Sequence, residues 1–348
     1  MPNLKSSINN LHFKKAGSSF TSDNLKVSEQ NSFSLSGKTK IENYVAVILA
    51  YYDGHLFIKD QLHSIFEQSH KALHVFLCDD QSKKPFSSDN LQLNTEQLSK
   101  LSFATHSQNI GPTKSFLKPL ENITDKFDYF AFSDQDDIWH EDKIEKAIAK
   151  LSKVPRSTPA LYCARTEIVD TSAKNILGNS PLFSRTPSFQ NALVQSIGGG
   201  NTMVFNRAAK NLIKNSSLNL DVIFHDWWVY LIISGAGGYI FFDSKPCLKY
   251  RQHDSNFVGS NNSWGARLIR IRLLLQGHFR KWCDINIEHL LKNKYLLTDY
   301  NQKVLDDFIK ARRSNLFKRL YFFKRSGIYR QTLFGNFGLI IGIILNRV

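Results

Sequence analysis

Cysteine is scarce in this chain of 348 residues, and its four copies are widely separated (Cys78, Cys163, Cys247 and Cys283). The absence of any CxxC pair or zinc-type spacing argues against a disulfide scaffold and against a structural zinc site. The N-terminus also lacks a basic segment leading into an apolar one, which argues against a secretory signal. Together these absences predict a cytoplasmic protein in a reducing compartment.

Several common catalytic motifs are missing as well. There is no GxxxxGK[ST] phosphate loop, no GxGxxG fingerprint and no GxSxG elbow, and the first strand-to-helix turn contains the single glycine Gly54. These absences disfavour a P-loop nucleotidase, a dinucleotide-binding domain and a serine hydrolase of the elbow type.

Acidic residues are depleted at the C-terminal end. The net charge is +15, and Gly265–Val348 contains 17 Lys and Arg against 5 Asp and Glu, which gives 17 − 5 = +12. Between Lys310 and Arg330 basic residues alternate with aromatic and aliphatic ones without any acid, and the apolar tail 333–345 falls short of the ~20 residues of a spanning helix. We expect a basic, amphipathic helical region over 263–348 that contacts an anionic membrane surface or caps the domain as a solvated helix pair. Nucleic acid is not an expected partner, because no recognised nucleic-acid module accompanies the charge.

The rest of the chain divides into an arm and a domain. Residues 1–40 are rich in Ser, Asn and Lys without an apolar period, which indicates a disordered or loosely attached arm. Apolar runs at 44–50, 73–78, 101–105 and 129–133 are typical of buried strands, and helical spacing follows at 58–66 and 140–151. This alternation predicts an α/β domain over 41–262, with a mainly parallel twisted sheet covered by helices.

Polar residues gather where the predicted strands end. Asp53 follows the first strand, Asp79 and Asp80 end the second, Asn109 follows the third, and Ser133-Asp134-Gln135-Asp136-Asp137 closes the fourth. The carboxyl ends of parallel strands meet at one edge of the sheet, where ligands bind. Clustered carboxylates repel one another unless a cation neutralises them, so a nucleotide-binding crevice with a divalent metal is expected here.

With these residues in view, the chain resembles the family-2 glycosyltransferases of GT-A fold, in particular their bacterial rhamnosyltransferase-like branch. The resemblance covers about 44–259. It rests on the order and spacing of Tyr52-Asp53-Gly54, Asp79-Asp80-Gln81-Ser82, Asn109-Ile110-Gly111, Ser133-Asp134-Gln135-Asp136-Asp137-Ile138-Trp139, Gly198-Gly199-Gly200-Asn201, His225-Asp226-Trp227-Trp228 and Tyr250-Arg251-Gln252-His253. The chain departs from the family pattern at Asp53, where Asn is usual, and at Lys84, where an acid is common.

The resemblance implies roles for these residues. Asp226 is expected to be the catalytic base, and Asp134 and Asp136 to form the DxD element in which Asp136 ligates Mg or Mn. His253 is a candidate second metal ligand or a structural histidine. The expected donor-binding residues are Tyr52, Asp53, Asp80, Asn109, Asp134, Arg251 and His253. The expected acceptor-binding residues are Gly199, Gly200, Trp227 and Trp228, with the alternatives that the glycines form a flexible turn and the tryptophans belong to the core.

The predicted function is therefore an inverting sugar transfer from a nucleoside diphosphate to a growing, lipid-linked surface glycan of O-antigen or capsule type. By resemblance the donor is dTDP-rhamnose, with UDP-sugars next, and the enzyme is peripheral on the inner face of the cell membrane. Two other classes stay open at this point: a metal-dependent nucleotidyl- or phosphotransferase, and a non-catalytic protein that binds membrane or nucleic acid through its basic region.

Overall fold

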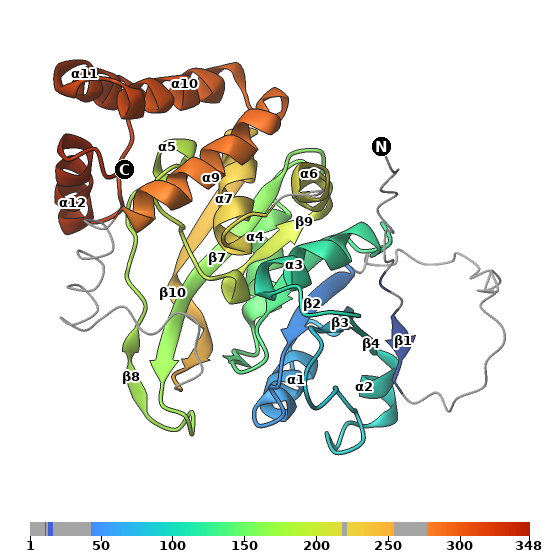
Figure 1. Ribbon diagram of the computed structural model, residues 1–348. Helices are drawn as coiled ribbons and strands as arrows, with labels where there is room; N and C mark the ends of the chain where they lie inside the picture. Colours follow the sequence, from blue (N-terminus) through green and yellow to red (C-terminus); the bar gives the residue numbers. More distant parts are fainter. Residues whose placement is uncertain (1–10, 12, 17–42, 218–220, 254–276) are drawn as a thin grey trace, which may run out of the picture.

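The computed structural model describes residues 11, 13–16, 43–217, 221–253 and 277–348 (Figure 1). In this part of the chain ten strands form one sheet, in the order β1-β4-β3-β2-β5-β9-β7-β10-β6, with β8 paired to β7. The strands are β1 Lys14–Lys15, β2 Val45–Tyr51, β3 Leu73–Asp79, β4 Leu101–Thr105, β5 Tyr129–Ser133, β6 Ile138–Trp139, β7 Ala160–Val169, β8 Ile176–Asn179, β9 Val204–Asn206 and β10 Tyr239–Arg251.

The first half of the sheet is parallel and runs β4-β3-β2-β5. Strand β9 then pairs antiparallel with both β5 and β7, and β10 returns parallel to β7. Because β2, β3, β4 and β5 point the same way, their carboxyl ends lie along one edge, as the sequence predicts. The predicted mainly parallel α/β sheet is confirmed.

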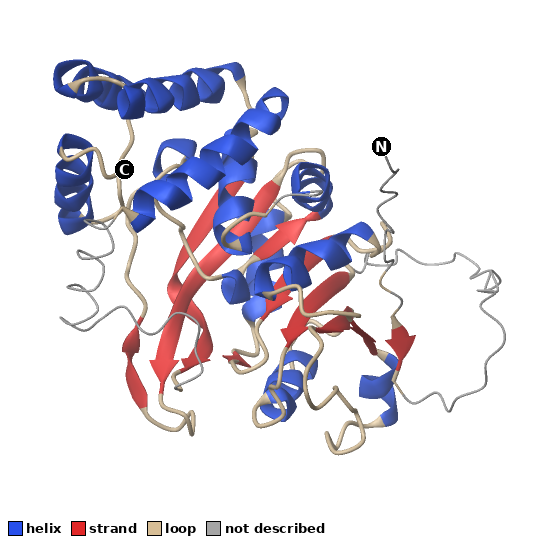
Figure 2. Cartoon of the chain, in the orientation of Figure 1, coloured by secondary structure: helices blue, strands red, loops and turns tan. Residues whose placement is uncertain are grey.

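Helices cover both faces of the sheet (Figure 2). The α-helices of the described residues are α1 Ile58–Phe66, α2 Thr95–Ser99, α3 Pro112–Leu117, α4 Lys143–Leu151, α5 Phe189–Ala192, α6 Arg207–Ser217, α7 His225–Gly235, α9 His278–Lys292, α10 Asp299–Arg313, α11 Leu316–Ser326 and α12 Leu333–Ile344. Side chains alternate along β2: Ala46 and Ile48 join one buried cluster with α3, α6 and α7, whereas Val47 and Leu49 join another with α1 and α4. Burial on both faces explains why β2 reads as a continuous apolar run.

The N-terminal arm is attached at one point in the described residues. Strand β1 pairs antiparallel with β4, and the Phe13 ring packs edge-on against Phe76 at 5.1 Å. The remainder of the predicted arm, and the expected boundary near 262, lie outside the described residues.

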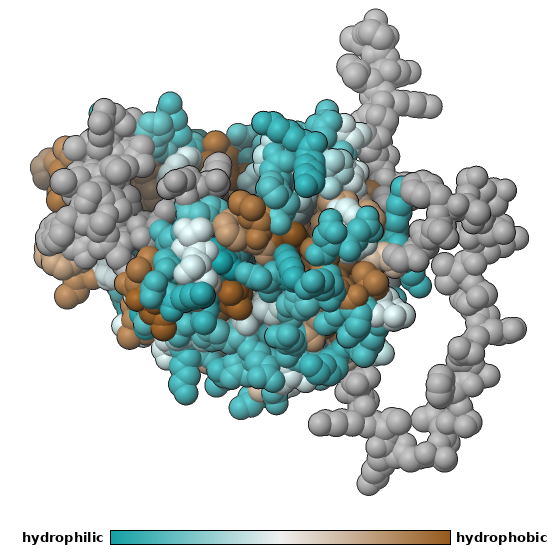
Figure 3. Space-filling model, turned by 90° about the horizontal axis from the view of Figure 1, so that it is seen from below, coloured by the Kyte–Doolittle hydropathy of each residue, from teal (hydrophilic) through white to brown (hydrophobic). Residues whose placement is uncertain are grey.

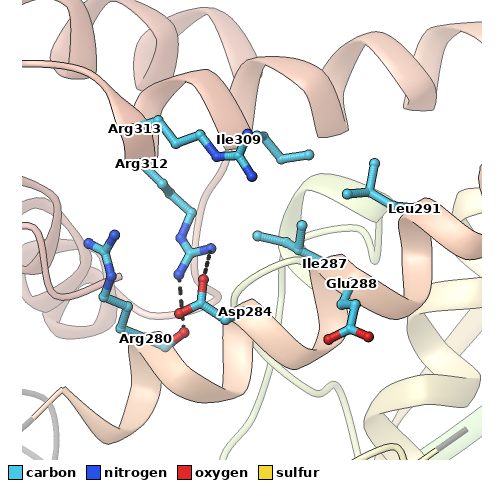
Figure 4. Close-up of a pocket in the computed structure, with 8 residues that line it drawn as sticks. All are labelled: Arg280, Asp284, Ile287, Glu288, Leu291, Ile309, Arg312 and Arg313. Atoms are coloured by element: carbon cyan, nitrogen blue, oxygen red, sulfur yellow. Dashed lines mark hydrogen bonds and ion pairs between the residues drawn. The ribbon is translucent and has the colours of Figure 1, made fainter.

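The C-terminal helices continue the core of the sheet domain. Cys283, Ile287 and Leu290 of α9 belong to the same buried cluster as α7. The Arg312 side chain joins α10 to α9 through an ion pair with Asp284 at 2.7 Å and a hydrogen bond to the Arg280 carbonyl at 3.1 Å (Figure 4). The predicted helical character of this region is confirmed. Across the described residues, no helix combines the length and apolar character that crossing a membrane requires.

Candidate active site

The acidic loop after β5 lies where the sequence places it, at the carboxyl edge of the sheet. Asp134 and Asp136 are both partly buried. Burial, together with the negative charges of Asp136 and Asp226, raises the pKa of Asp134 to about 7. The structure therefore brings Asp226, which is distant in sequence, into the electrostatic field of Asp134 and Asp136. Figure 3 looks onto this edge, which is mostly hydrophilic where its atoms are coloured.

The end of β10 contacts the acidic loop directly. His253 Nε2 lies 2.9 Å from Asp136 Oδ2, and the imidazole stacks on the Phe57 ring at a centroid distance of 4.9 Å. The two residues expected to ligate a metal are thus adjacent, although they come from strands whose sequence positions are more than a hundred residues apart.

Arg251 binds the acidic loop in this structure. Its side chain is only 3% exposed, and it donates to the Asp136 carbonyl at 3.0 Å, to the Thr171 carbonyl at 2.7 Å and to Asp60 Oδ2 at 3.0 Å. These contacts hold the backbone of the acidic loop against the end of β7 and against α1. The expected contact of this guanidinium with the donor stays a prediction.

Asp226 lies in the first turn of α7, where the helix dipole favours a negative charge. Its Oδ1 accepts a hydrogen bond from the Trp227 N–H at 2.7 Å, and the Ser196 hydroxyl is a further partner. Burial outweighs these contacts and raises the pKa of Asp226 to about 6. At neutral pH the group is an ionised carboxylate with enhanced basicity, which suits a general base.

The glycine run packs against the residue before Asp226. The His225 ring stacks on Phe116 at 4.1 Å, burial lowers its pKa to about 3, and it is therefore neutral. A Cβ on Gly200 would clash with His225 Nε2, and one on Gly199 would lie 2.7 Å from Asn201 Oδ1. At these glycines the backbone therefore lies close to other residues of the protein, His225 and Asn201, and the loop lies beside Asp226.

The two tryptophans after Asp226 are core residues. Trp228 is fully buried, whereas Trp227 is 5% exposed, donates from Nε1 to the Ala192 carbonyl at 2.7 Å and stacks on Phe279. Their burial agrees with the alternative that the tryptophans belong to the core, and the expected contact of their rings with an acceptor sugar stays a prediction.

The loop after β2 is clamped to the acidic loop by a residue that sequence reasoning missed. Gln135 accepts from the Tyr52 N–H at 2.8 Å and donates to the Tyr52 carbonyl at 3.0 Å. A Cβ on Gly54 would clash with the same Gln135 side chain, which explains the glycine. The Tyr52 ring is 46% exposed at the edge of the site, so it is free to contact a ligand.

The remaining donor-site candidates bind neighbouring loops. Asp53 has φ +48°, a conformation that Asn and Asp tolerate better than most residues, and its Oδ1 accepts from the Lys83 N–H at 2.9 Å. Asp80 is 4% exposed and accepts from the N–H groups of Ile110 and Gly111 at 2.7 and 2.9 Å. Asn109 is exposed and donates to the Asp80 carbonyl at 3.0 Å. These contacts join the ends of β2, β3 and β4 into one continuous rim.

A buried polar cluster lies beneath the acidic loop. Lys143 is fully buried, donates to the Asn201 carbonyl at 2.5 Å and lies 3.3 Å from the centroid of the Trp139 ring. Asn201 donates in turn to Asp137 Oδ2 at 2.6 Å. Burial raises the pKa of Asp137 and lowers that of Lys143 to about 8. The sequence already indicated that Lys143 is buried, because it lies four and eight positions before Ala147 and Leu151, on the apolar face of its helix.

The donor set suits a hard divalent cation in its chemistry. Asp136 and His253 offer a carboxylate oxygen and an imidazole nitrogen in direct contact, and the carboxylate of Asp134 lies in the same loop. Among the described residues, no group of three or more His, Cys, Asp or Glu side chains is close enough to form a complete metal site. Asp136 and His253 are therefore the residues that fit Mg²⁺ or Mn²⁺.

Comparison with known proteins defines the class. The model of glycosyl transferase family 2 matches residues 46–212, which contain the rim and the acidic loop. Together with the relative of 30% identity described below, this match shows that the chain belongs to the family and is a glycosyltransferase. The classes of nucleotidyl- or phosphotransferase and of non-catalytic binding protein are set aside.

Particular relatives sharpen the comparison. The dTDP-rhamnosyl transferase RfbG of Shigella flexneri is 30% identical over 245 residues, which cover 67% of this chain and 81% of the relative. The putative teichuronic acid biosynthesis glycosyltransferase TuaG of Bacillus subtilis (strain 168) is 25% identical over 254 residues, which cover 69% of this chain and 93% of the relative.

Two solved structures are distant likenesses. S. aureus TarS 1–349 in complex with UDP-GlcNAc has a TM-score of 0.48 and 13% identity, covering 82% of this chain and 93% of that one. The mannosyltransferase PcManGT of Pyrobaculum calidifontis in complex with GDP-Man and Mn²⁺ has a TM-score of 0.45 and 15% identity, covering 91% and 89%.

Proposed function

We propose that this chain transfers rhamnose, with inversion, from dTDP-rhamnose to a growing, lipid-linked surface glycan of O-antigen or capsule type. The observation that carries the proposal is the shared field of Asp134, Asp136 and Asp226, which concentrates negative charge at the carboxyl edge of the sheet. The donor is chosen because the relative of 30% identity is described as a dTDP-rhamnosyl transferase. A UDP-sugar is the second candidate, since one of the structural likenesses is a complex with UDP-GlcNAc.

The geometry of the site supports the following proposed roles in the reaction. Asp226, with a pKa of about 6, is ionised at neutral pH and accepts the proton of the acceptor hydroxyl as that oxygen attacks the anomeric carbon. A single base is sufficient for inversion. Asp136 and His253 would hold the divalent metal, which supplies Lewis acidity toward the diphosphate leaving group. Arg251 acts indirectly, because it fixes the backbone carbonyl of Asp136.

The rim formed by the loops after β2, β3 and β4 is proposed to bind the nucleoside. Tyr52 and Asn109 are exposed there and offer a ring face and an amide. Asp53 and Asp80 shape the rim through their contacts with backbone N–H groups. Gly199 and Gly200 place their loop next to Asp226, on the side proposed for the acceptor.

We also propose that the enzyme works in the cytoplasm, peripherally on the inner face of the cell membrane, where nucleotide sugars and a lipid-linked acceptor meet. The basic C-terminal region supports an anionic membrane surface as a partner.

Calorimetric titration of dTDP, UDP and GDP, with and without Mn²⁺, into the wild type and Asp136→Ala tests the donor site. We expect metal-dependent binding of dTDP that the substitution abolishes. Absence of binding by every nucleotide would refute the donor proposal, and preference for another base would replace dTDP. NMR of the product's anomeric proton tests inversion, and retention of configuration would contradict the role of Asp226 as the base.

A further inference from the structure

Helix α12 is apolar except for Asn336, whose side chain bonds the Arg330 backbone, and it is covered on one side only. The segment Leu333–Ile344 contains no charged residue, and within it only Leu339, Gly342 and Ile343 are buried. The opposite side, which we call the α12 face, is open to solvent, with Phe334 86% exposed. A helix that is hydrophobic all round is ordinarily buried, so this side requires an occupant. The α12 face consists of Leu333, Phe334, Phe337, Ile340, Ile341 and Ile344.

The surrounding structure holds this face in place. Arg319 of α11 donates to the carbonyls of Ile343 and Ile344 at 3.2 and 3.1 Å, where the helix dipole leaves negative charge. The Thr332 hydroxyl caps the other end by accepting from the Gly335 N–H at 3.0 Å. With glycines at 335, 338 and 342, the segment is a weak helix former in water, so its helix depends on these contacts and on an apolar environment.

The neighbouring helix α11 carries the charge of the region. Exposed Lys318 and Lys324 stand beside Phe317 and Tyr321, whose rings are 85% and 59% exposed. Between Phe308 and Val348 there are nine Lys and Arg residues and no Asp or Glu. Exposed aromatic rings with flanking cations, next to an apolar helix face, are the composition of a helix that lies in a bilayer interface.

We propose that the α12 face binds an anionic lipid bilayer, with α12 lying along the membrane plane and α11 contacting the headgroups. Twelve residues of helix span only about 18 Å, against a hydrocarbon thickness of about 30 Å, so α12 is monotopic. A second copy docking through the same face would bring two acid-free basic surfaces together, which charge repulsion opposes. The proposal assigns the face that meets the membrane partner named above, and it is independent of which sugar is transferred.

Flotation of the full chain with lipid vesicles tests the assignment. The vesicles are phosphatidylglycerol with phosphatidylethanolamine, compared with phosphatidylcholine alone. We expect Phe334→Ser with Phe337→Ser to lower partition onto the anionic vesicles roughly tenfold for each phenylalanine. The matched control is Ile176→Ser with Leu177→Ser on β8, where both side chains are 63% exposed, and it leaves partition unchanged. Lys318→Ala with Lys324→Ala weakens binding at low salt and has little effect at high salt, because salt screens the headgroup charge.

Three results separate the outcomes. Unchanged vesicle binding by the double phenylalanine variant, or no binding by the wild type, overturns the proposal. If that variant instead converts a dimer to a monomer in sedimentation, a second copy covers the face and the bilayer assignment is wrong. Nucleotide binding is measured on the same samples: its retention with loss of flotation supports the assignment, and its absence in the wild type counts against the donor proposal only.

Discussion

The substitution Asp226→Asn is predicted to abolish catalysis and to stabilise the fold at the same time. Burial raises the pKa of this carboxyl from 3.8 to about 6, and one pKa unit corresponds to about 1.4 kcal/mol. The ionised form is therefore destabilised in the folded protein by about 3 kcal/mol. Asparagine has the same shape, carries no charge, and keeps an oxygen for the Trp227 N–H.

The sign of the effect depends on pH. A carboxyl whose pKa is raised by folding is favoured in its protonated form, so the cost is absent below the unfolded pKa near 4. The cost grows between pH 4 and 6 and is complete above pH 6. At pH 7.5 we expect Asp226→Asn to unfold at a higher temperature than the wild type, by a few degrees. The difference should nearly vanish at pH 3.5, which lies below the unfolded pKa.

Differential scanning calorimetry at the two pH values measures the stability, and turnover of nucleotide sugar measures catalysis, which should fall by about a thousandfold or more. Asp125→Asn is the matched control. The ion pair of Asp125 with Lys210 at 2.9 Å lowers its pKa, so this substitution should destabilise slightly and leave catalysis intact. A lower melting temperature of Asp226→Asn at pH 7.5 would refute the burial argument, and retained turnover would refute the role as base.

Three further outcomes are expected. The pH profile of kcat/KM should fall below a pKa of about 6 as Asp226 becomes protonated, and an acidic limb near pH 4 would contradict the raised pKa. Gly200→Ala should lower activity strongly, because a Cβ there clashes with the preceding histidine of the Asp226 turn, whereas Gly338→Ala, which meets nothing within 4 Å, should be silent in the same assay. Arg251→Lys should weaken Mn²⁺ binding in calorimetry by removing part of the support of the Asp136 backbone, and unchanged metal affinity would show that this support is dispensable.

Much of the catalytic edge could be predicted from local patterns. A buried strand followed by acids identifies a strand end at β2, β3 and β5, because periodicity and charge are both local properties of sequence. The strands β7 and β9 were missed, since their pairing with β5 and β10 depends on contacts across the sheet. Strand β10 runs from Tyr239 to Arg251, and its second half brings His253 to Asp136.

Individual roles were harder to predict than positions. The sequence places three residues in the site region: Arg251, Trp227 and Trp228. It does not reveal that the guanidinium of Arg251 donates to the protein backbone, or that other residues cover the two tryptophan rings. Gln135 lies inside the acidic motif, but its contact with Tyr52 depends on how two loops meet. Long-range packing decides whether a polar side chain serves a ligand or the protein.

Helix α7 packs against the sheet on one side and against the C-terminal helices on the other. Trp228 meets His289 of α9 edge-on at 6.1 Å, and Asn301 of α10 donates to the carbonyls of Ser234 and Gly235 at 3.1 and 2.9 Å. The carboxylate of Asp226, the proposed base, thus lies on a helix whose far side packs against the C-terminal region, which resembles an appendage in sequence. A shortened chain ending before α9 would keep every residue of the acidic motif and still lack the support that positions its base. The C-terminal helices thus support the helix of the proposed base as well as carrying the proposed membrane face.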